Sequence, residues 1–373
     1  MIIKNGKVFG EDKSFQKRDI YIENGVIVPN LEQVIDKTII DADGCYVIPG
    51  LIDIHSHGAC GHDFSDASEE GIHRILEYQR EQGITSYCPT TMTLPRVQLE
   101  NVMKTAKRVK DKNYHKNKEA TLVGINMEGP FIDIEKKGAH LEEYILEPDV
   151  DFFRSCNELS GGLVRLITLA PNKKGVIEFI REIQGEATIA LGHSAAIYEE
   201  AKRALDVGAS HITHLYNAMR SMHHREPGLI GAAIEKEGCM AELICDGIHV
   251  HESMVHVAFK LFPDRIILIS DSIRATGMGD GIYELGGQQV KVSGRLATLE
   301  DGTIAGSVTN LFECMKMAIA YGIKPEDAIA SATMNPAKCI GIYQEVGSIS
   351  IGKKADILLL DSQFQLVKVI SLE

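Results

Sequence analysis

The sequence is short of positive charge. Lysine and arginine together number 39, against 52 aspartate and glutamate residues, so the 373-residue chain has a formal net charge of −13 at pH 7. Because nucleic acids and anionic membranes attract positively charged surfaces, this deficit argues against both as general partners. A phosphorylated substrate would therefore need a local basic pocket.

Long apolar runs and closely paired cysteines are also lacking. No segment approaches the roughly 20 apolar residues of a membrane span, and the N-terminal MIIKNGKVFGEDKSF has neither the apolar core nor the cleavage site of a secretory signal, so we expect a cytoplasmic protein. The eight cysteines form no CxxC pair and mostly stand in apolar runs, which is typical of reduced core side chains. This pattern disfavours both a disulfide framework and a structural zinc site.

Apolar, strand-like runs alternate with helical patterns through the middle of the chain. The runs lie at about 50–54, 84–90, 121–128, 163–170, 187–193, 210–214, 239–246 and 266–271. Helical spacing of apolar residues marks SEEGIHRILEYQREQG, PRVQLENVMKTAKRVKD, GVIEFIREIQ, AIYEEAKRALDVG and ESMVHVAFKLF. Eight strand–helix units predict a (β/α)8, TIM-like barrel of the α/β class. A doubly wound open sheet is the alternative, but it would not gather the ends of the first, third, fifth, sixth and eighth strands around one point.

Both ends of the chain are typical of short strands broken by turns. Residues 1–48 include MIIKNGKVFG and DIYIENGVIV, and residues 340–373 supply two or three further strands. Since neither end could bury a core alone, we predict one small β-sandwich domain from residues 1–48 plus 340–373. Residues 49–339 would form the catalytic barrel, with a β-hairpin insertion after the eighth strand and closing helices near 307–321 and 325–333.

Metal-competent side chains stand at the ends of five of these runs. His55 and His57 are two residues apart on an extended segment, so both imidazoles point to one side and can reach one ion. The other four runs end at Glu128, His193, His214 and Asp271. An isolated HxH pair is more often an ordinary loop pair, but barrel active sites lie where the strands end, and imidazole with carboxylate suits a catalytic divalent metal. The whole set therefore predicts a catalytic metal centre.

Ordered motifs along nearly the whole chain carry a family resemblance. They are PGLIDIHSHGACGHDFSD, NMEGPFI, KKGAHLE, LGHSAA, THLYNAM, HHREPGLIGAA, ICDGIHVH, ILISDSIRATGMGDG and AGSVTNL. The chain resembles the amidohydrolase superfamily and, within it, the deacetylases that act on N-acetylglucosamine 6-phosphate. The resemblance implies a hydrolase that removes acetate from a phosphorylated amino sugar, in amino-sugar catabolism and cell-wall sugar recycling. It also implies a homodimer.

The predicted ligands are divided between a core metal site and a second ion. Glu128, His193 and His214 form the core site, and His55 and His57 allow a second ion, with Asp271 beside it. Many superfamily members carry a carboxylated lysine at the end of the fourth strand, where this chain has Leu169-Ala170-Pro171. Glu128 would then be the bridging ligand. We expect one or two divalent ions per subunit, zinc first, with iron, manganese or cobalt as alternatives.

Catalytic and substrate-binding roles follow for further residues. Asp271 is expected to act as the general base and then as the general acid that protonates the departing amine. The resemblance implies that His140 contacts the substrate carbonyl, where an imidazole could stabilise the developing oxyanion. The residues expected to contact the sugar or its phosphate are His140, Asn217, Ala218, Arg225 and His249.

Three other functions stay open. N-acetylgalactosamine 6-phosphate would require the same chemistry, and no single residue decides between the epimers. A cyclic-amide or nucleobase hydrolase is disfavoured by the missing lysine and by Arg225. A catalytically silent barrel that serves as an assembly partner would be expected to have lost ligands. We interpret the remaining histidines, including His211 in its strand and His115 in a Lys-rich surface stretch, as residues outside the site.

Overall fold

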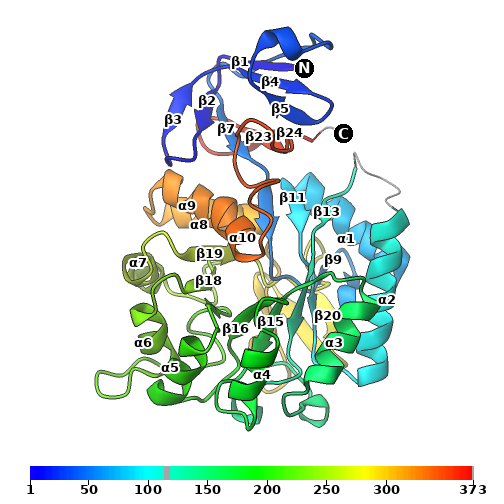
Figure 1. Cartoon of the computed structure of the whole chain (residues 1–373), viewed down its shortest axis with the longest axis vertical. Helices are drawn as coiled ribbons and strands as arrows, with labels where there is room; N and C mark the ends of the chain where they lie inside the picture. The colour runs from blue at the N-terminus through cyan, green and yellow to red at the C-terminus, as the bar shows by residue number, and fades with distance from the viewer. Residues whose placement is uncertain (113–117, 372–373) are drawn as a thin grey trace.

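Both ends of the chain lie in one small β domain (Figure 1). The structure, a computed structural model, describes residues 1–112 and 118–371, so the surface position predicted for His115 lies outside the described residues. One sheet has the order β5 (Val26–Val28), β4 (Ile20–Glu23), β1 (Ile2–Lys4) and β6 (Ile39–Asp41). The other has the order β24 (Leu366–Ile370), β23 (Ile357–Leu360), β7 (Tyr46–Pro49), β2 (Lys7–Phe9) and β3 (Phe15–Lys17).

The two sheets share one buried core. Ile3 and Ile22 of the first sheet belong to the same buried cluster as Val47 and Leu359 of the second. Because apolar residues from both termini fill this cluster, neither terminal segment could bury it alone. The predicted β-sandwich built from both ends is confirmed. The boundaries between residues 48 and 49 and between 339 and 340 stay a prediction.

Eight parallel strands form the barrel. They are β8 (Leu51–Asp53), β11 (Ile84–Tyr87), β14 (Ile125–Glu128), β15 (Val164–Leu169), β16 (Thr188–Leu191), β17 (His211–Ile212), β18 (Met240–Ile244) and β19 (Ile266–Ile269). Two short strands, β12 (Thr90–Thr91) and β13 (Thr121–Leu122), complete the pairing between β11 and β14. The Asp271 N–H donates to the His55 carbonyl at 2.9 Å and the His57 N–H to the Ser272 carbonyl at 2.7 Å, which joins the first strand to the eighth. The predicted (β/α)8 barrel is confirmed.

The helices pack amphipathic faces against the strands. In α1 (Glu69–Glu81), the Ser68 side chain caps the helix by accepting from the Gly71 N–H at 3.1 Å, and Ile72, Ile75 and Leu76 form its buried face. The other helices that the sequence predicts are α2 (Arg96–Lys112), α4 (Val176–Glu182), α5 (Tyr198–Asp206), α7 (Glu252–Leu261), α8 (Leu311–Ala320) and α9 (Pro325–Ala332). Among residues 1–112 and 118–371, no helix combines the length and apolarity that a transmembrane segment needs.

Some elements lie outside the predicted pattern. The structure adds α3 (Val150–Leu159), α6 (Gly228–Glu235) and α10 (Met334–Cys339), together with the short hairpin of β9 (Gly58–Ala59) and β10 (His62–Asp63). The predicted hairpin insertion has a third strand: β20 (Gly281–Leu285), β21 (Gln288–Ser293) and β22 (Leu296–Thr298) form an antiparallel sheet. Short 3-10 turns span Leu31–Gln33, Phe64–Asp66, Ile134–Lys136 and Glu142–Tyr144.

Candidate metal centre

One buried carboxylate lies at the centre of five imidazoles. Glu128 ends β14 and is 3% exposed. Its Oε1 atom lies 3.0 Å from His193 Nε2, 3.1 Å from His214 Nε2 and 3.3 Å from His55 Nε2, and its Oε2 atom lies 3.3 Å from His57 Nε2 and 3.4 Å from His140 Nε2. Strands far apart in the sequence thus bring their terminal side chains to one point. A carboxylate whose two oxygens face different histidines has the geometry of a bridging ligand.

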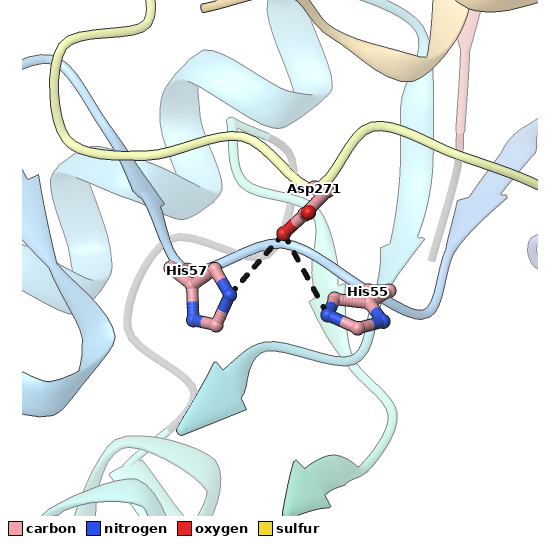
Figure 2. A group of neighbouring side chains, drawn as sticks. All are labelled: His55, His57 and Asp271. Atoms are coloured by element: carbon pink, nitrogen blue, oxygen red, sulfur yellow. Dashed lines mark ion pairs between the residues drawn. The ribbon is translucent and has the colours of Figure 1, made fainter. Parts of the chain in front are cut away.

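The first candidate group of ligands combines the first and eighth strands. Figure 2 shows His55 and His57 following the first strand and Asp271 approaching them from the segment after the eighth. Asp271 Oδ1 lies 3.2 Å from His57 Nε2 and 3.6 Å from His55 Nε2. One ligand atom from each of the three residues lies within 4.8 Å of the others, and all three side chains are buried. This spacing allows all three to bind one ion.

The second candidate group surrounds His193 and His214, whose Nε2 atoms lie 2.9 Å apart. His193 Nδ1 donates to the Lys136 carbonyl at 2.8 Å, and His214 Nδ1 donates to the Asn217 carbonyl at 3.2 Å. Because a carbonyl only accepts, each Nδ1 carries the proton and each Nε2 presents a lone pair toward Glu128. Backbone hydrogen bonds of this kind orient metal-binding imidazoles.

The donor set fits a divalent metal. His55 Nε2 is fully buried and has no hydrogen-bond partner among the described residues, although it faces Glu128 and Asp271. Burial opposes a positive charge on His57, but hydrogen bonds to Asp271 and Glu128 raise its pKa to about 10. The carboxylates of Asp271 and Glu128 therefore favour a positive charge among the imidazole rings. A metal ion would supply that charge once the imidazoles have released their protons. Imidazole and carboxylate donors suit several divalent ions, so the donor set does not single out one metal.

His140 differs from the other histidines. Its Nδ1 atom accepts a hydrogen bond from the Thr93 N–H at 3.1 Å, so the proton of the neutral ring lies on Nε2. Burial lowers the pKa of His140 to about 4, despite the hydrogen bond with Glu128. Although its ring nitrogen lies close enough to Glu128 and His193 to share an ion with them, this tautomer makes His140 a neutral hydrogen-bond donor and not a ligand.

A pocket of about 530 Å³ opens over the two ligand groups. Asn217, Ala218 and His249 line it beside the ligands, as does Lys136, which is outside the predicted set of site residues. Arg225 lies apart: it is exposed, hydrogen-bonds to the neighbouring His224 at 2.7 Å and does not line this pocket. The structure thus brings together the predicted site residues with the exception of Arg225.

His249 is held in place by an acidic neighbour. Its Nδ1 atom lies 2.7 Å from Asp246 Oδ2. Burial alone would lower the pKa of His249, but the hydrogen bond with Asp246 and the charge of that carboxylate raise it. A protonated His249 would place positive charge on the wall of a pocket in an otherwise acidic protein.

Three candidate ligands have a backbone that side chains other than glycine rarely adopt. His193, His214 and Asp271 have φ angles of 44°, 26° and 49°, within the left-handed region. Such conformations cost about 1–3 kcal/mol each and concentrate at functional sites. Here they occur where each strand ends and turn these side chains toward the centre.

Two buried polar residues were missed or given no role in the site. Glu242, in the middle of β18, is not among the predicted site residues, and the sequence predicts His211 as an ordinary strand residue. The two form a contact of 2.9 Å between Glu242 Oε1 and His211 Nε2, and Glu242 Oε2 lies 2.9 Å from His55 Nδ1. The acidic residue within the apolar run MAELI was the signal that could have indicated a buried, paired carboxylate.

Comparisons with known proteins agree with this geometry. Residues 46–371 match the amidohydrolase family. The chain is 39% identical over 327 residues to the N-acetylglucosamine-6-phosphate deacetylase of Bacillus subtilis (strain 168), covering 87% of this chain and 83% of that protein. It is 31% identical over 363 residues to the N-acetylgalactosamine-6-phosphate deacetylase of Escherichia coli O157:H7, covering 97% and 95%.

A solved structure is also similar along the whole chain. It is a mutant N-acetyl-D-glucosamine-6-phosphate deacetylase from Mycobacterium smegmatis in complex with N-acetyl-D-glucosamine-6-phosphate, with a TM-score of 0.91, 27% identity and coverage of 100% of this chain and 98% of that one. The extent of these matches confirms the resemblance drawn from the motifs. The chain belongs to the amidohydrolase family.

Proposed function

We propose that this protein is a metal-dependent deacetylase that converts N-acetyl-D-glucosamine 6-phosphate to D-glucosamine 6-phosphate and acetate. The observation that carries the proposal is the arrangement around Glu128, where five imidazoles and the carboxylate of Asp271 gather, and where Glu128, Asp271 and all of these imidazoles except His55 line one pocket. The similarity to deacetylases of phosphorylated amino sugars supports the choice of substrate.

The residues proposed to hold metal are Glu128, His193, His214, His55, His57 and Asp271. We propose zinc, in two ions per subunit, with Glu128 as the shared ligand. When bound, the metal would lower the pKa of a water molecule and polarise the acetyl carbonyl. Iron, manganese and cobalt are alternatives that metal analysis separates.

Asp271 is proposed to move the proton. Burial opposes its ionisation, but the hydrogen bond with His57 and the nearby charge of His55 keep the pKa of Asp271 below its usual value. The ionised carboxylate accepts a proton from the attacking water as the oxygen adds to the acetyl carbon. When the carbon–nitrogen bond breaks, the same carboxyl group gives that proton to the sugar nitrogen, which would otherwise leave as an unfavourable anion.

His140 is proposed to stabilise the oxyanion. Its Nε2–H donor faces Glu128 at 3.4 Å, at the edge of the pocket. As the carbonyl oxygen gains charge, this donor can hydrogen-bond to it more strongly than to the neutral carbonyl, which lowers the barrier. Because Thr93 holds Nδ1, the ring is oriented for this contact before the substrate binds.

Asn217, Ala218 and His249 are proposed to bind the 6-phosphate within the pocket. We propose that Arg225 contributes to the same phosphate from the partner subunit of a homodimer. Arg225 is exposed, and the same loop carries Met222, an apolar side chain that is 46% exposed, so this loop could reach a second copy. A guanidinium suits a phosphate because it offers paired donors.

The test is acetate release from a panel of phosphorylated and unphosphorylated N-acetyl amino sugars, with metal content measured on the same sample. We expect N-acetylglucosamine 6-phosphate to have the highest kcat/KM. The galactosamine epimer belongs in the panel because of the similarity to the E. coli enzyme. A sample that binds metal but releases no acetate from any sugar would favour a silent assembly protein or a cyclic-amide hydrolase. A cytoplasmic location stays a prediction.

A further inference from the structure

Glu242 makes three hydrogen bonds inside the barrel. It lies on β18, which is next to β19, the last strand of the barrel, and it is 0% exposed. Its Oε2 atom lies 2.9 Å from His55 Nδ1 and accepts from the His214 backbone N–H at 3.0 Å. Its Oε1 atom lies 2.9 Å from His211 Nε2.

These contacts determine which nitrogen of His55 faces the metal centre. Burying a carboxylate is costly unless several donors pair with it, and here His55, His211 and the His214 N–H all do so. Because an ionised carboxylate only accepts, His55 must place a proton on Nδ1. Its Nε2 atom, which has no hydrogen-bond partner among the described residues, then presents a lone pair toward Glu128 and Asp271.

The same oxygen also links two parts of the centre. His55 belongs to the group formed by the first and eighth strands. His214 belongs to the second group, because its Nε2 atom lies 3.1 Å from Glu128 Oε1 and 2.9 Å from His193 Nε2. Glu242 Oε2 holds the ring of His55 and the backbone of His214. It thus sets the position of a ligand on the first strand relative to a ligand on the sixth.

We propose that Glu242 is a positioning residue that secures the ion held by His55, His57 and Asp271. The proposal rests on the proposed function, because it assumes that these residues bind metal. Glu242 is fully buried and does not line the pocket, so its effect on catalysis passes through His55. Removing a group that orients a metal-binding histidine typically costs about 10- to 100-fold in metal affinity.

The experiment compares Glu242→Gln and Glu242→Leu with the unchanged protein. The amide oxygen of Gln can still accept from His55 and from the His214 backbone N–H while its NH2 group faces His211. His55 therefore keeps its tautomer but loses the neighbouring negative charge. We expect Glu242→Gln to weaken binding of the second metal equivalent about 10-fold. Leucine cannot accept a hydrogen bond, and we expect Glu242→Leu to weaken binding about 100-fold or to lose that equivalent.

Thr168→Val is the matched control. Thr168 is also fully buried in a barrel strand, and its hydroxyl group shares a 2.8 Å hydrogen bond with Thr213. Its loss removes a buried hydrogen bond without touching an imidazole of the centre, so we expect both metal equivalents to remain. Metal titration followed by elemental analysis gives the readout, and thermal unfolding in excess chelator reports any purely structural loss.

The outcomes separate this inference from the proposed function. Unchanged affinity in a folded Glu242→Leu would overturn the positioning role, because leucine cannot hold the Nδ1 proton of His55. If Glu242→Leu did not fold, unchanged affinity in Glu242→Gln would overturn the role given to the carboxylate of Glu242. Equal weakening in Glu242→Gln and Thr168→Val would overturn it too, because the effect would then be a general response to core changes. If the unchanged protein bound no metal and released no acetate, the proposed function itself would fail.

Discussion

Replacing Asp271 by Asn tests the proton transfer directly. Asparagine has nearly the same shape and keeps an oxygen where Asp271 Oδ1 lies, 3.2 Å from His57 Nε2 and 3.6 Å from His55 Nε2. It cannot accept a proton under working conditions. We therefore expect Asp271→Asn to retain metal while its turnover falls.

The size of the loss follows from the role. A general acid–base group contributes about 10²–10⁴-fold to the rate, which corresponds to about 3–5 kcal/mol in the activation barrier. Only 9% of Asp271 is exposed, so bulk water has little access to replace it as the proton acceptor. Acetate release under saturating sugar phosphate gives kcat, and metal analysis of the same sample shows whether the centre is intact.

Asp149→Asn is the control for the change of charge. Asp149 caps α3 by accepting from the Phe152 N–H at 2.9 Å, and asparagine caps a helix equally well. We expect this variant to match the unchanged protein. Retention of more than about a tenth of kcat in Asp271→Asn, with metal still bound, would assign the proton transfer to another group.

Three further changes test the ligands and the phosphate contact. Glu128→Ala should empty the centre, because it removes the carboxylate shared by both groups, and stoichiometric metal in this variant would contradict the bridging role. The double change His55→Ala with His57→Ala should remove one metal equivalent and leave partial activity, and an unchanged ratio of metal to protein would rule out two ions. Arg225→Ala should lower kcat/KM for the phosphorylated sugar by about 10- to 150-fold, the loss expected for a charge-assisted hydrogen bond of about 1.5–3 kcal/mol. It should barely change hydrolysis of unphosphorylated N-acetylglucosamine, and an equal loss on both substrates would make Arg225 a structural residue.

The barrel strands were predictable because they are buried on both faces. Such strands are continuous apolar runs, as at Ile266–Ile269, and can be recognised without an alternation of apolar and polar residues. Helices such as α1 show a clear apolar stripe. The missed α6 (Gly228–Glu235) has the sequence GLIGAAIE, and six of its eight residues are buried. A helix that is apolar on nearly all sides shows no 3.6-residue period. Its two glycines further weaken the helical signal, because glycine is a poor helix former.

The candidate ligands were predictable for a related reason. In a parallel barrel all strands end at one rim, so a histidine or carboxylate at the end of a run must approach the others. Arg225 follows no strand, and its exposed position depends on how the loop before α6 leaves the barrel. The sequence therefore predicts Arg225 as a residue type suited to a phosphate, but it does not predict that Arg225 lies outside the pocket of its own subunit.

The orientation of the imidazoles depends on contacts that no local pattern specifies. The proton on His193 Nδ1 is held by the carbonyl of Lys136, 57 positions away, and His55 is held by Glu242, 187 positions away. Each partner becomes a neighbour only when the strands close into a barrel. The types of ligand therefore follow from the sequence alone, whereas the nitrogen that each ring offers to a metal follows only from the fold. Glu242 does not face the pocket, but it sets the orientation of a predicted ligand, and for this reason its role can be recognised only in the folded structure.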